Sequence, residues 1–100
     1  MRKVTENATM AFLANETFKQ GNTEVILEDG NASLYLHGNK IAENSERCVY
    51  ISDAGWQTRT TKERLNGILE TIGAEKIYQK GGIWYHEDVE FAPKKVSKRG

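Results

Sequence analysis

The chain has 100 residues, which suffices for one domain, because a separate second core would be too small to stabilise itself. Hydrophobic residues make up 38% of the chain and charged residues 28%, a balance that excludes a disordered protein and indicates a globular domain. The formal net charge of zero excludes a DNA mimic, and the apolar runs fall far below the ~20 residues that span a bilayer.

The first predicted element is a helix over residues 5–15, because apolar residues recur on one of its faces at helical spacing. This stripe consists of Val4, Ala8, Ala11 and Phe12. Its alanines suit packing against a flat surface such as a sheet, and Thr5 suits the N-cap position of the helix. We expect Phe18, in the non-periodic stretch that follows, to lie in a loop.

A β-hairpin is predicted next, over residues 23–37, around an Asp-Gly turn at positions 29 and 30. A two-residue turn pairs Glu28 with Asn31, and this pairing fixes the register of both strands. The resulting apolar face carries Thr23, Val25, Leu27, Ala32, Leu34 and Leu36. Turns at residues 38–39 and 44–46 extend the hairpin to a four-stranded antiparallel meander that ends at Ile51.

The second helix is predicted to begin at Thr60, because residues 60–63 match a capping box in which Glu63 reaches back to the cap. Its apolar stripe, which we expect to pack on a sheet face, consists of Leu65, Ile68, Leu69 and Ile72. Gly73 then supplies the residue that commonly ends a helix in the left-handed conformation.

A second hairpin is predicted over residues 76–86, around the Gly81-Gly82 turn, and a short strand over residues 89–91 follows it. The predicted fold is therefore α+β, with an N-terminal helix, a four-stranded antiparallel meander, a second helix and a C-terminal β-hairpin or three-strand unit. Residues 1–92 form a single α+β domain in this interpretation. Residues 93–100 are predicted to be a disordered basic tail, since Val96 is their only bulky apolar residue after Pro93.

Polar and basic side chains crowd the approach to the second helix. Backbone amides at a helix N-terminus attract anions, so these residues suit phosphate binding, but a solvated helix face explains them equally. Exposed tryptophan beside arginine and lysine is typical of protein interfaces and of base-stacking surfaces, whereas buried tryptophans would simply close the ends of a small core. The candidate partner-binding residues are Trp56, Gln57, Arg59, Lys62, Arg64 and Trp84.

The basic residues at the end of the chain allow three interpretations. Residues 1–92 carry ten basic against 14 acidic residues, a net charge of −4, and the tail carries +4. The tail is a solvated end, a nonspecific contact to nucleic acid, or a contact to an acidic partner or to the acidic body itself. In the nucleic-acid interpretation, the binding residues are Arg59, Lys62, Arg64, Lys94, Lys95, Lys98 and Arg99.

The sequence lacks a recognisable catalytic or metal-binding constellation. His37 and His86 are far apart, and with one cysteine they do not give the ligand spacing of a zinc site. Cys48 lies in a predicted strand beside apolar residues and is expected to be a core residue, in a chain with no possible intrachain disulfide. Neither a P-loop nor a Gly-x-Ser-x-Gly elbow occurs. We therefore expect no enzyme activity, no cofactor and no metal.

Three segments resemble a family of short proteins that tailed bacteriophages encode. They are "FKQGNTEVILEDGNASLYLHGNKIAEN", "YISDAGWQTRTTKERLNGIL" and "IYQKGGIWY", and "HGNKIA" and "DAGWQTRTTKERLN" are their most specific parts. The resemblance covers residues 4–85, and the basic end departs from the family pattern. It implies a phage protein made in a bacterial cell, and it carries over no catalytic residue, because no activity is assigned to the family.

These observations lead to one expectation of function and two alternatives. We expect a non-catalytic phage accessory protein that binds a host or phage protein in the host cell cytoplasm and counters a bacterial defence. One alternative is a nucleic-acid-binding module that uses the N-terminus of the second helix and the basic tail. The other is a minor component of the virion or of its assembly. No contact with a membrane is expected, and the sequence leaves the oligomeric state open.

Overall fold

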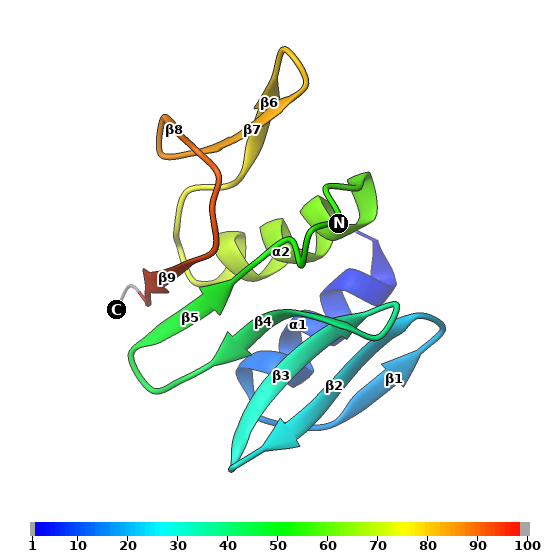
Figure 1. Ribbon diagram of the computed structural model, residues 1–100. Helices are drawn as coiled ribbons and strands as arrows, with labels where there is room; N and C mark the ends of the chain where they lie inside the picture. Colours follow the sequence, from blue (N-terminus) through cyan, green and yellow to red (C-terminus); the bar gives the residue numbers. More distant parts are fainter. Residues whose placement is uncertain (1, 99–100) are drawn as a thin grey trace.

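A computed structural model describes residues 2–98 of the chain and shows the predicted α+β fold (Figure 1). Its elements in chain order are α1 (Lys3–Leu13), β1 (Phe18–Gln20), β2 (Thr23–Glu28), β3 (Asn31–Leu36), β4 (Asn39–Asn44), β5 (Cys48–Ile51), α2 (Arg59–Thr71), β6 (Tyr78–Lys80), β7 (Ile83–His86), β8 (Val89–Glu90) and β9 (Lys94–Ser97).

The strands form two antiparallel sheets. The larger sheet has six strands in the order β1-β2-β3-β4-β5-β9, and the smaller one has the order β6-β7-β8. Both helices lie against one face of the larger sheet, and the smaller sheet extends away from it beyond α2 (Figure 1). The predicted meander is thus the centre of a wider sheet, and the predicted C-terminal three-strand unit is a sheet of its own.

The register of the β2–β3 hairpin is confirmed residue by residue. Glu28 lies opposite Asn31, and Val25 lies opposite Leu34. Asp29 and Gly30 both have positive φ, 54° and 84°, as the two central residues of a tight hairpin turn require. Leu27, which was predicted on the apolar face, is 46% exposed. It lies near the tip of the hairpin, which extends beyond the helices that cover the sheet (Figure 1).

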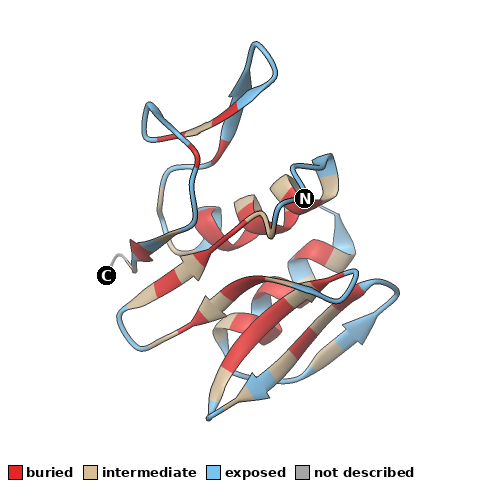
Figure 2. Ribbon diagram, viewed as in Figure 1, coloured by how far each residue is buried: buried red, intermediate tan, exposed pale blue. Residues whose placement is uncertain are grey.

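One continuous core fills the space between the helices and the six-stranded sheet. Buried residues are concentrated on the helices and the central strands, while the strand ends and turns are exposed (Figure 2). The core includes Phe12, Leu34, Ile41, Val49, Ile51, Leu65, Ile68 and Leu69. The predicted stripe of α2 therefore does pack toward the sheet, with Ile72 only partly buried at its end.

The start of α1 differs from the prediction. The helix begins at Lys3, and its N-cap residue Arg2 makes no side-chain cap hydrogen bond. Thr5, the predicted cap, lies inside the helix with no exposed surface, and its hydroxyl contacts Glu63 and Arg64 of α2. The capping pattern was misleading because the threonine hydroxyl is used in contacts between the helices instead.

Phe18 also differs from the prediction, since it begins strand β1 instead of lying in a loop. It pairs with Val25 at one edge of the six-stranded sheet. A strand of three residues contains too few positions for an alternating pattern to be recognised.

The prediction of a disordered tail from residue 93 is wrong for residues 94–97. These residues form β9, which pairs with β5 so that Val96 lies opposite Val49 and is 9% exposed. The Nζ atom of Lys94 lies 2.9 Å from His86 Nδ1 and 3.4 Å from Glu87 Oε1. The fold therefore extends beyond residue 92, because the edge of β5 offers backbone groups to a segment with little apolar character. Arg99 lies outside the described residues.

Candidate binding surface

The N-terminus of α2 is capped two residues earlier than predicted. Thr58 is the N-cap, with an extended backbone, and its Oγ1 accepts a hydrogen bond of 3.1 Å from the backbone N–H of Thr61. The predicted cap, Thr60, instead lies within the helix. Glu63 does not close a capping box, because its carboxylate is engaged by two arginines, which are stronger partners than a backbone amide.

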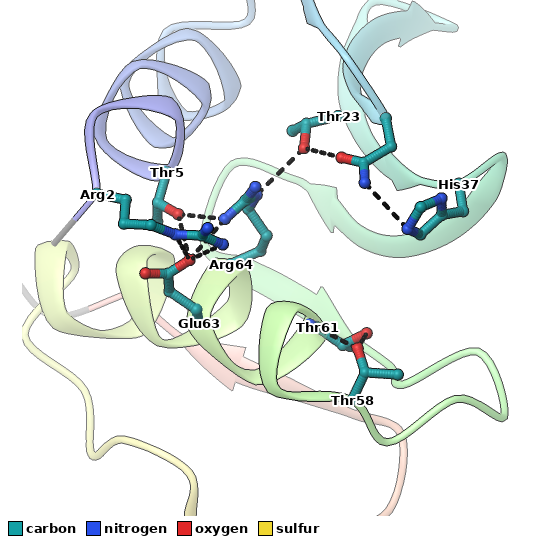
Figure 3. Close-up of polar contacts among 9 residues, drawn as sticks. Arg2, Thr5, Thr23, His37, Thr58, Thr61, Glu63 and Arg64 are labelled. Carbon is teal, nitrogen blue, oxygen red and sulfur yellow. Dashed lines mark hydrogen bonds and ion pairs between the residues drawn. The ribbon is translucent and has the colours of Figure 1, made fainter.

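Arg64 lies at the centre of a buried polar cluster and is only 4% exposed (Figure 3). Its Nη1 donates to Glu63 Oε1 at 2.8 Å and to the hydroxyl of Thr5, and its Nε donates to Thr23 Oγ1 at 3.2 Å. The side chain thus connects α2 with α1 and β2. The expectation that Arg64 offers a surface charge to a partner or to nucleic acid is wrong.

The charged groups of this cluster are paired within the molecule, with two arginines on one glutamate. Arg2 lowers the pKa of the Glu63 carboxyl group, whose Oε1 lies 2.7 Å from Arg2 Nε, and Glu63 in turn raises the pKa of Arg2. Burial lowers the pKa of Arg64, although an arginine side chain remains protonated in a protein. Two guanidinium groups therefore share one carboxylate, and this arrangement stabilises contacts between elements instead of presenting a site.

Trp84 is also buried, at 2% exposure, so its place among the candidate partner-binding residues is wrong and the alternative of a tryptophan in the core is correct for it. Its ring packs edge to face on Phe91, with centroids 5.8 Å apart. The Nζ atom of Lys62 lies 5.8 Å from the Trp84 ring centroid and donates to Gln79 Oε1 at 3.0 Å. Lys62 therefore links α2 to the smaller sheet, and its charge is engaged within the molecule.

Trp56 remains at the surface, 64% exposed, on the loop between β5 and α2. Asp53 organises this loop: its carboxylate accepts hydrogen bonds from the Gly55 N–H at 2.8 Å and from Gln57 Nε2 at 3.0 Å. Ala54 and Gly55 have positive φ, 54° and 85°, which gives the tight turn before the tryptophan. The indole is thus presented by a structured turn.

A pocket of about 380 Å³ lies beside Trp56. It is lined by Leu36, His37, Asn39, Ile41, Asp53, Ala54, Trp56, Thr58 and Thr61. Leu36 and Ile41 are buried, so they give the pocket an apolar floor, whereas His37 from the β3–β4 turn and Asn39 at the start of β4 bring polar groups. All the lining residues except Leu36 come from the two segments "HGNKIA" and "DAGWQTRTTKERLN", which are adjacent here.

A chain of hydrogen bonds connects the pocket rim with the buried arginine (Figure 3). Thr23 Oγ1, which accepts from Arg64, donates to Asn22 Oδ1 at 3.1 Å. The Nδ2 of Asn22 lies 3.0 Å from Nε2 of His37. An amide nitrogen can only donate, so this ring nitrogen is the acceptor and the orientation of His37 is fixed. The sequence analysis did not identify His37 and Asn39 as pocket residues, because polar residues of this kind are already expected at a turn between two strands.

The residues of the nucleic-acid interpretation do not gather into one continuous surface. Arg59 is exposed and lines a hollow of about 460 Å³ together with Arg2, Lys62 and Glu63. Lys94 contacts Glu87 of the acidic body, as one interpretation of the tail predicted. Lys95 and Lys98 belong to the far edge of the larger sheet or directly follow it.

Cys48 is partly exposed, and the expectation of a core cysteine is wrong. Val49 and Ile51 of the same strand fill the core, whereas the Cys48 Sγ atom lies 3.2 Å from Ser45 Oγ. Within residues 2–98, no three His, Cys, Asp or Glu side chains lie together as a group that could hold a metal ion. The described helices are too short or too polar to cross a membrane.

Comparison with known proteins identifies a family but no solved relative. No curated protein and no solved structure shows significant similarity to this chain. The match to a family model runs from residue 1 to residue 98 and thus includes Lys94, Lys95 and Lys98, three of the four basic residues that we expected to depart from the family pattern. That model describes the Kyanoviridae Gp96 protein, so the chain belongs to this family of phage proteins.

Proposed function

We propose that this protein is a non-catalytic phage accessory protein that binds a host or phage protein in the host cell cytoplasm through the surface around Trp56. The observation that carries the proposal is a 64% exposed tryptophan beside a pocket with an apolar floor. Tryptophan is the residue type most enriched where truncation costs a protein interface about 2 kcal/mol or more. A single exposed indole on a structured turn supports such a contact without a large loss of entropy on binding.

The pocket suits a side chain of a partner protein. Its floor, Leu36 and Ile41, accepts an apolar group, and His37, Asn39 and Asp53 add polar groups to its lining. Gln57 in the loop and Arg59 at the start of α2 are both exposed and would form the polar rim. Arg64 and Trp84 are buried and Lys62 is engaged with Gln79, so these three residues are not part of the contact in our proposal.

A component of a bacterial defence is the partner class that we propose. Membership of a phage family supports an action inside an infected cell. A protein of this size inhibits most simply by occupying a surface that its target needs. The two segments that carry the most specific resemblance meet at the Trp56 pocket, which supports this surface as the contact.

Affinity capture from lysates of infected and uninfected host cells tests the proposal. The Trp56→Ala variant should lose the captured protein, since truncation of the central aromatic group weakens an interface by about 2 kcal/mol or more. Met10→Ala is the matched control, because Met10 is also 64% exposed but lies on α1. A partner that both variants retain equally, or that both lose, would contradict the proposed surface.

Nucleic-acid binding remains the second candidate, supported by exposed Arg59 and by the hollow that it shares with Arg2 and Lys62. Titration with duplex and single-stranded DNA at low and moderate salt tests it. Binding should fall with salt in proportion to the number of phosphates that the protein neutralises. Absence of binding at low salt would eliminate this candidate, and loss of binding in a variant with Lys95 and Lys98 both changed to alanine would assign it to the basic end.

A further inference from the structure

Strand β9 leaves one edge of the six-stranded sheet without a neighbour. The backbone N–H of Lys98 donates to Arg47 O at 2.9 Å, and hydrogen-bonded pairs alternate along an antiparallel ladder. Val96, opposite Val49, therefore exchanges hydrogen bonds with β5. The backbone groups of Lys95 and Ser97 point the other way, and they have no hydrogen-bond partner among residues 2–98.

There is room for another chain beside this edge. A hollow of about 370 Å³ is lined by Ala74, Glu87, Lys94, Lys95, Val96 and Ser97. Its only carboxylate, that of Glu87, lies 3.4 Å from Lys94 Nζ and is paired with it. The groups that remain to meet an incoming strand are the outward backbone of β9 and unpaired positive charge.

The charge on β9 selects the occupant. Within the described part of the chain, neither Lys95 nor Lys98 makes an ion pair. A second copy of β9 in antiparallel pairing would bring lysines near lysines, and like charges across strands are destabilising. An extended segment with carboxylates on the face that carries Lys95 would instead place opposite charges together.

The other edge of the sheet is less suited to this role. Strand β1 has three residues, and Gln20 and Phe18 pair with Thr23 and Val25 across a tight turn. Only the backbone of Lys19 then faces outward, and its side chain lies 3.7 Å from Glu24 Oε1. An additional strand at this edge would gain fewer backbone hydrogen bonds and less charge attraction than at β9.

We propose that the free edge of β9 binds an extended acidic segment of a partner protein as a seventh strand. The outward N–H and C=O groups of Lys95 and Ser97 supply the backbone hydrogen bonds. Lys95 supplies the preference for carboxylates on its face of the sheet, and Lys98 adds positive charge just beyond the end of β9 on the opposite face. This site shares no residue with the Trp56 pocket, and it does not depend on the function proposed for that pocket.

Lysines on an edge strand often have the opposite role, which is to prevent pairing with other chains. The two roles predict different results with a suitable peptide. A protective role predicts that extended peptides do not bind, whatever their charge. A recognition role predicts binding of an acidic strand and rejection of a basic strand.

An end-blocked synthetic peptide of alternating glutamate and valine is the probe, and amide NMR of the full chain is the measurement. The Lys95 and Ser97 signals should shift, and their hydrogen exchange should slow by about tenfold or more in the bound state. A peptide with lysine in place of glutamate should not bind. Trp56→Ala should bind the acidic peptide as the wild type does, which separates this site from the proposed function.

Two changes to the backbone test the seventh strand itself. A peptide that is N-methylated at alternate amides loses its donors but not its charge, and it should bind at least about tenfold more weakly. Lys95→Pro removes an N–H that β5 does not use, so the fold should tolerate it, whereas Lys95→Ala keeps the N–H and should weaken binding less. Equal binding of the methylated and unmethylated peptides, binding of the lysine peptide, or signal shifts confined to the Trp56 pocket would overturn the proposal.

Discussion

Two neighbouring regions of α2 and the loop before it use similar residues for different purposes. Around Arg64, the polar groups are buried and satisfy one another across α1, α2 and β2. Around Trp56, an aromatic ring is left 64% exposed on a turn that Asp53 holds. Residue type alone therefore does not distinguish a structural residue from a binding residue here, but the number of internal partners does.

The largest difference in stability is expected between alanine variants of the two tryptophans. Trp84→Ala removes a ring that is 2% exposed and packs on Phe91, so it should lower the free energy of unfolding by about 3–5 kcal/mol. Trp56→Ala should change it by less than about 0.5 kcal/mol. Urea denaturation followed by circular dichroism measures both. Similar losses for the two variants would mean that Trp56 also has a packing role, and the comparison of the two regions would fail.

The next largest difference in stability is expected between alanine variants of Arg64 and Arg59. Arg64→Ala leaves Thr5 and Thr23 without their donor and Glu63 without one of its two arginine partners, at a cost of about 3 kcal/mol. Arg59→Ala, on the exposed first turn of the same helix, should cost less than about 0.5 kcal/mol. If Arg64→Ala also lost less than about 0.5 kcal/mol, the buried cluster would contribute little to the stability of the fold. Urea midpoints of the two variants, with equal slopes, are the measurement.

The cap of α2 should give a smaller effect. Thr58→Ala removes the hydroxyl that accepts from the Thr61 N–H, and loss of such a cap costs about 1 kcal/mol. Thr60→Ala is the control, because Thr60 lies inside the helix, and it should cost less than Thr58→Ala. The reverse order of the two thermal unfolding midpoints would restore Thr60 as the cap and would also question the position of Trp56 relative to the helix.

The results for these residues show what the sequence could and could not predict. The β2–β3 register was predictable because the Asp29-Gly30 turn and the alternation of apolar residues are both local. The burial of Arg64 was missed because its partners Thr5 and Thr23 lie 59 and 41 positions away in the chain. A signal was nevertheless present, since Thr61, Arg64 and Ile68 share the helix face that the apolar stripe occupies.

The candidate site was predictable only in part. Trp56, Gln57 and Arg59 were identified from composition and do lie at the surface. The pocket itself was not predictable, because its floor and its β3–β4 rim depend on how the meander meets the loop before α2. Strand β9 was missed for a different reason, since Val96 is its only apolar residue and a single residue has no period.

The exposed face of the larger sheet extends the comparison, because its charged network is open to solvent whereas the Arg64 cluster is buried. The nearby Ser33 hydroxyl, the hydrogen bond from Tyr35 and the ion pair with Lys40 lower the pKa of Glu28 to about 2. Since the folded pKa lies below the ordinary value of 4.5, the stabilisation is complete above that value. It is then lost as the pH falls from about 4.5 toward about 2.

This network should therefore give the smallest effect, and one that depends on pH. In Glu28→Gln, the fall in urea midpoint across that acidic range should be shallower than in the wild type, because the titrating group is absent. Tyr35→Phe should give an intermediate slope, since it removes one donor that lies 2.8 Å from Glu28 Oε2. Three identical slopes would show that the Glu28 carboxylate contributes nothing measurable to stability, as is common for exposed ion pairs. Of these two networks, only the buried cluster around Arg64 would then stabilise the fold through its charges.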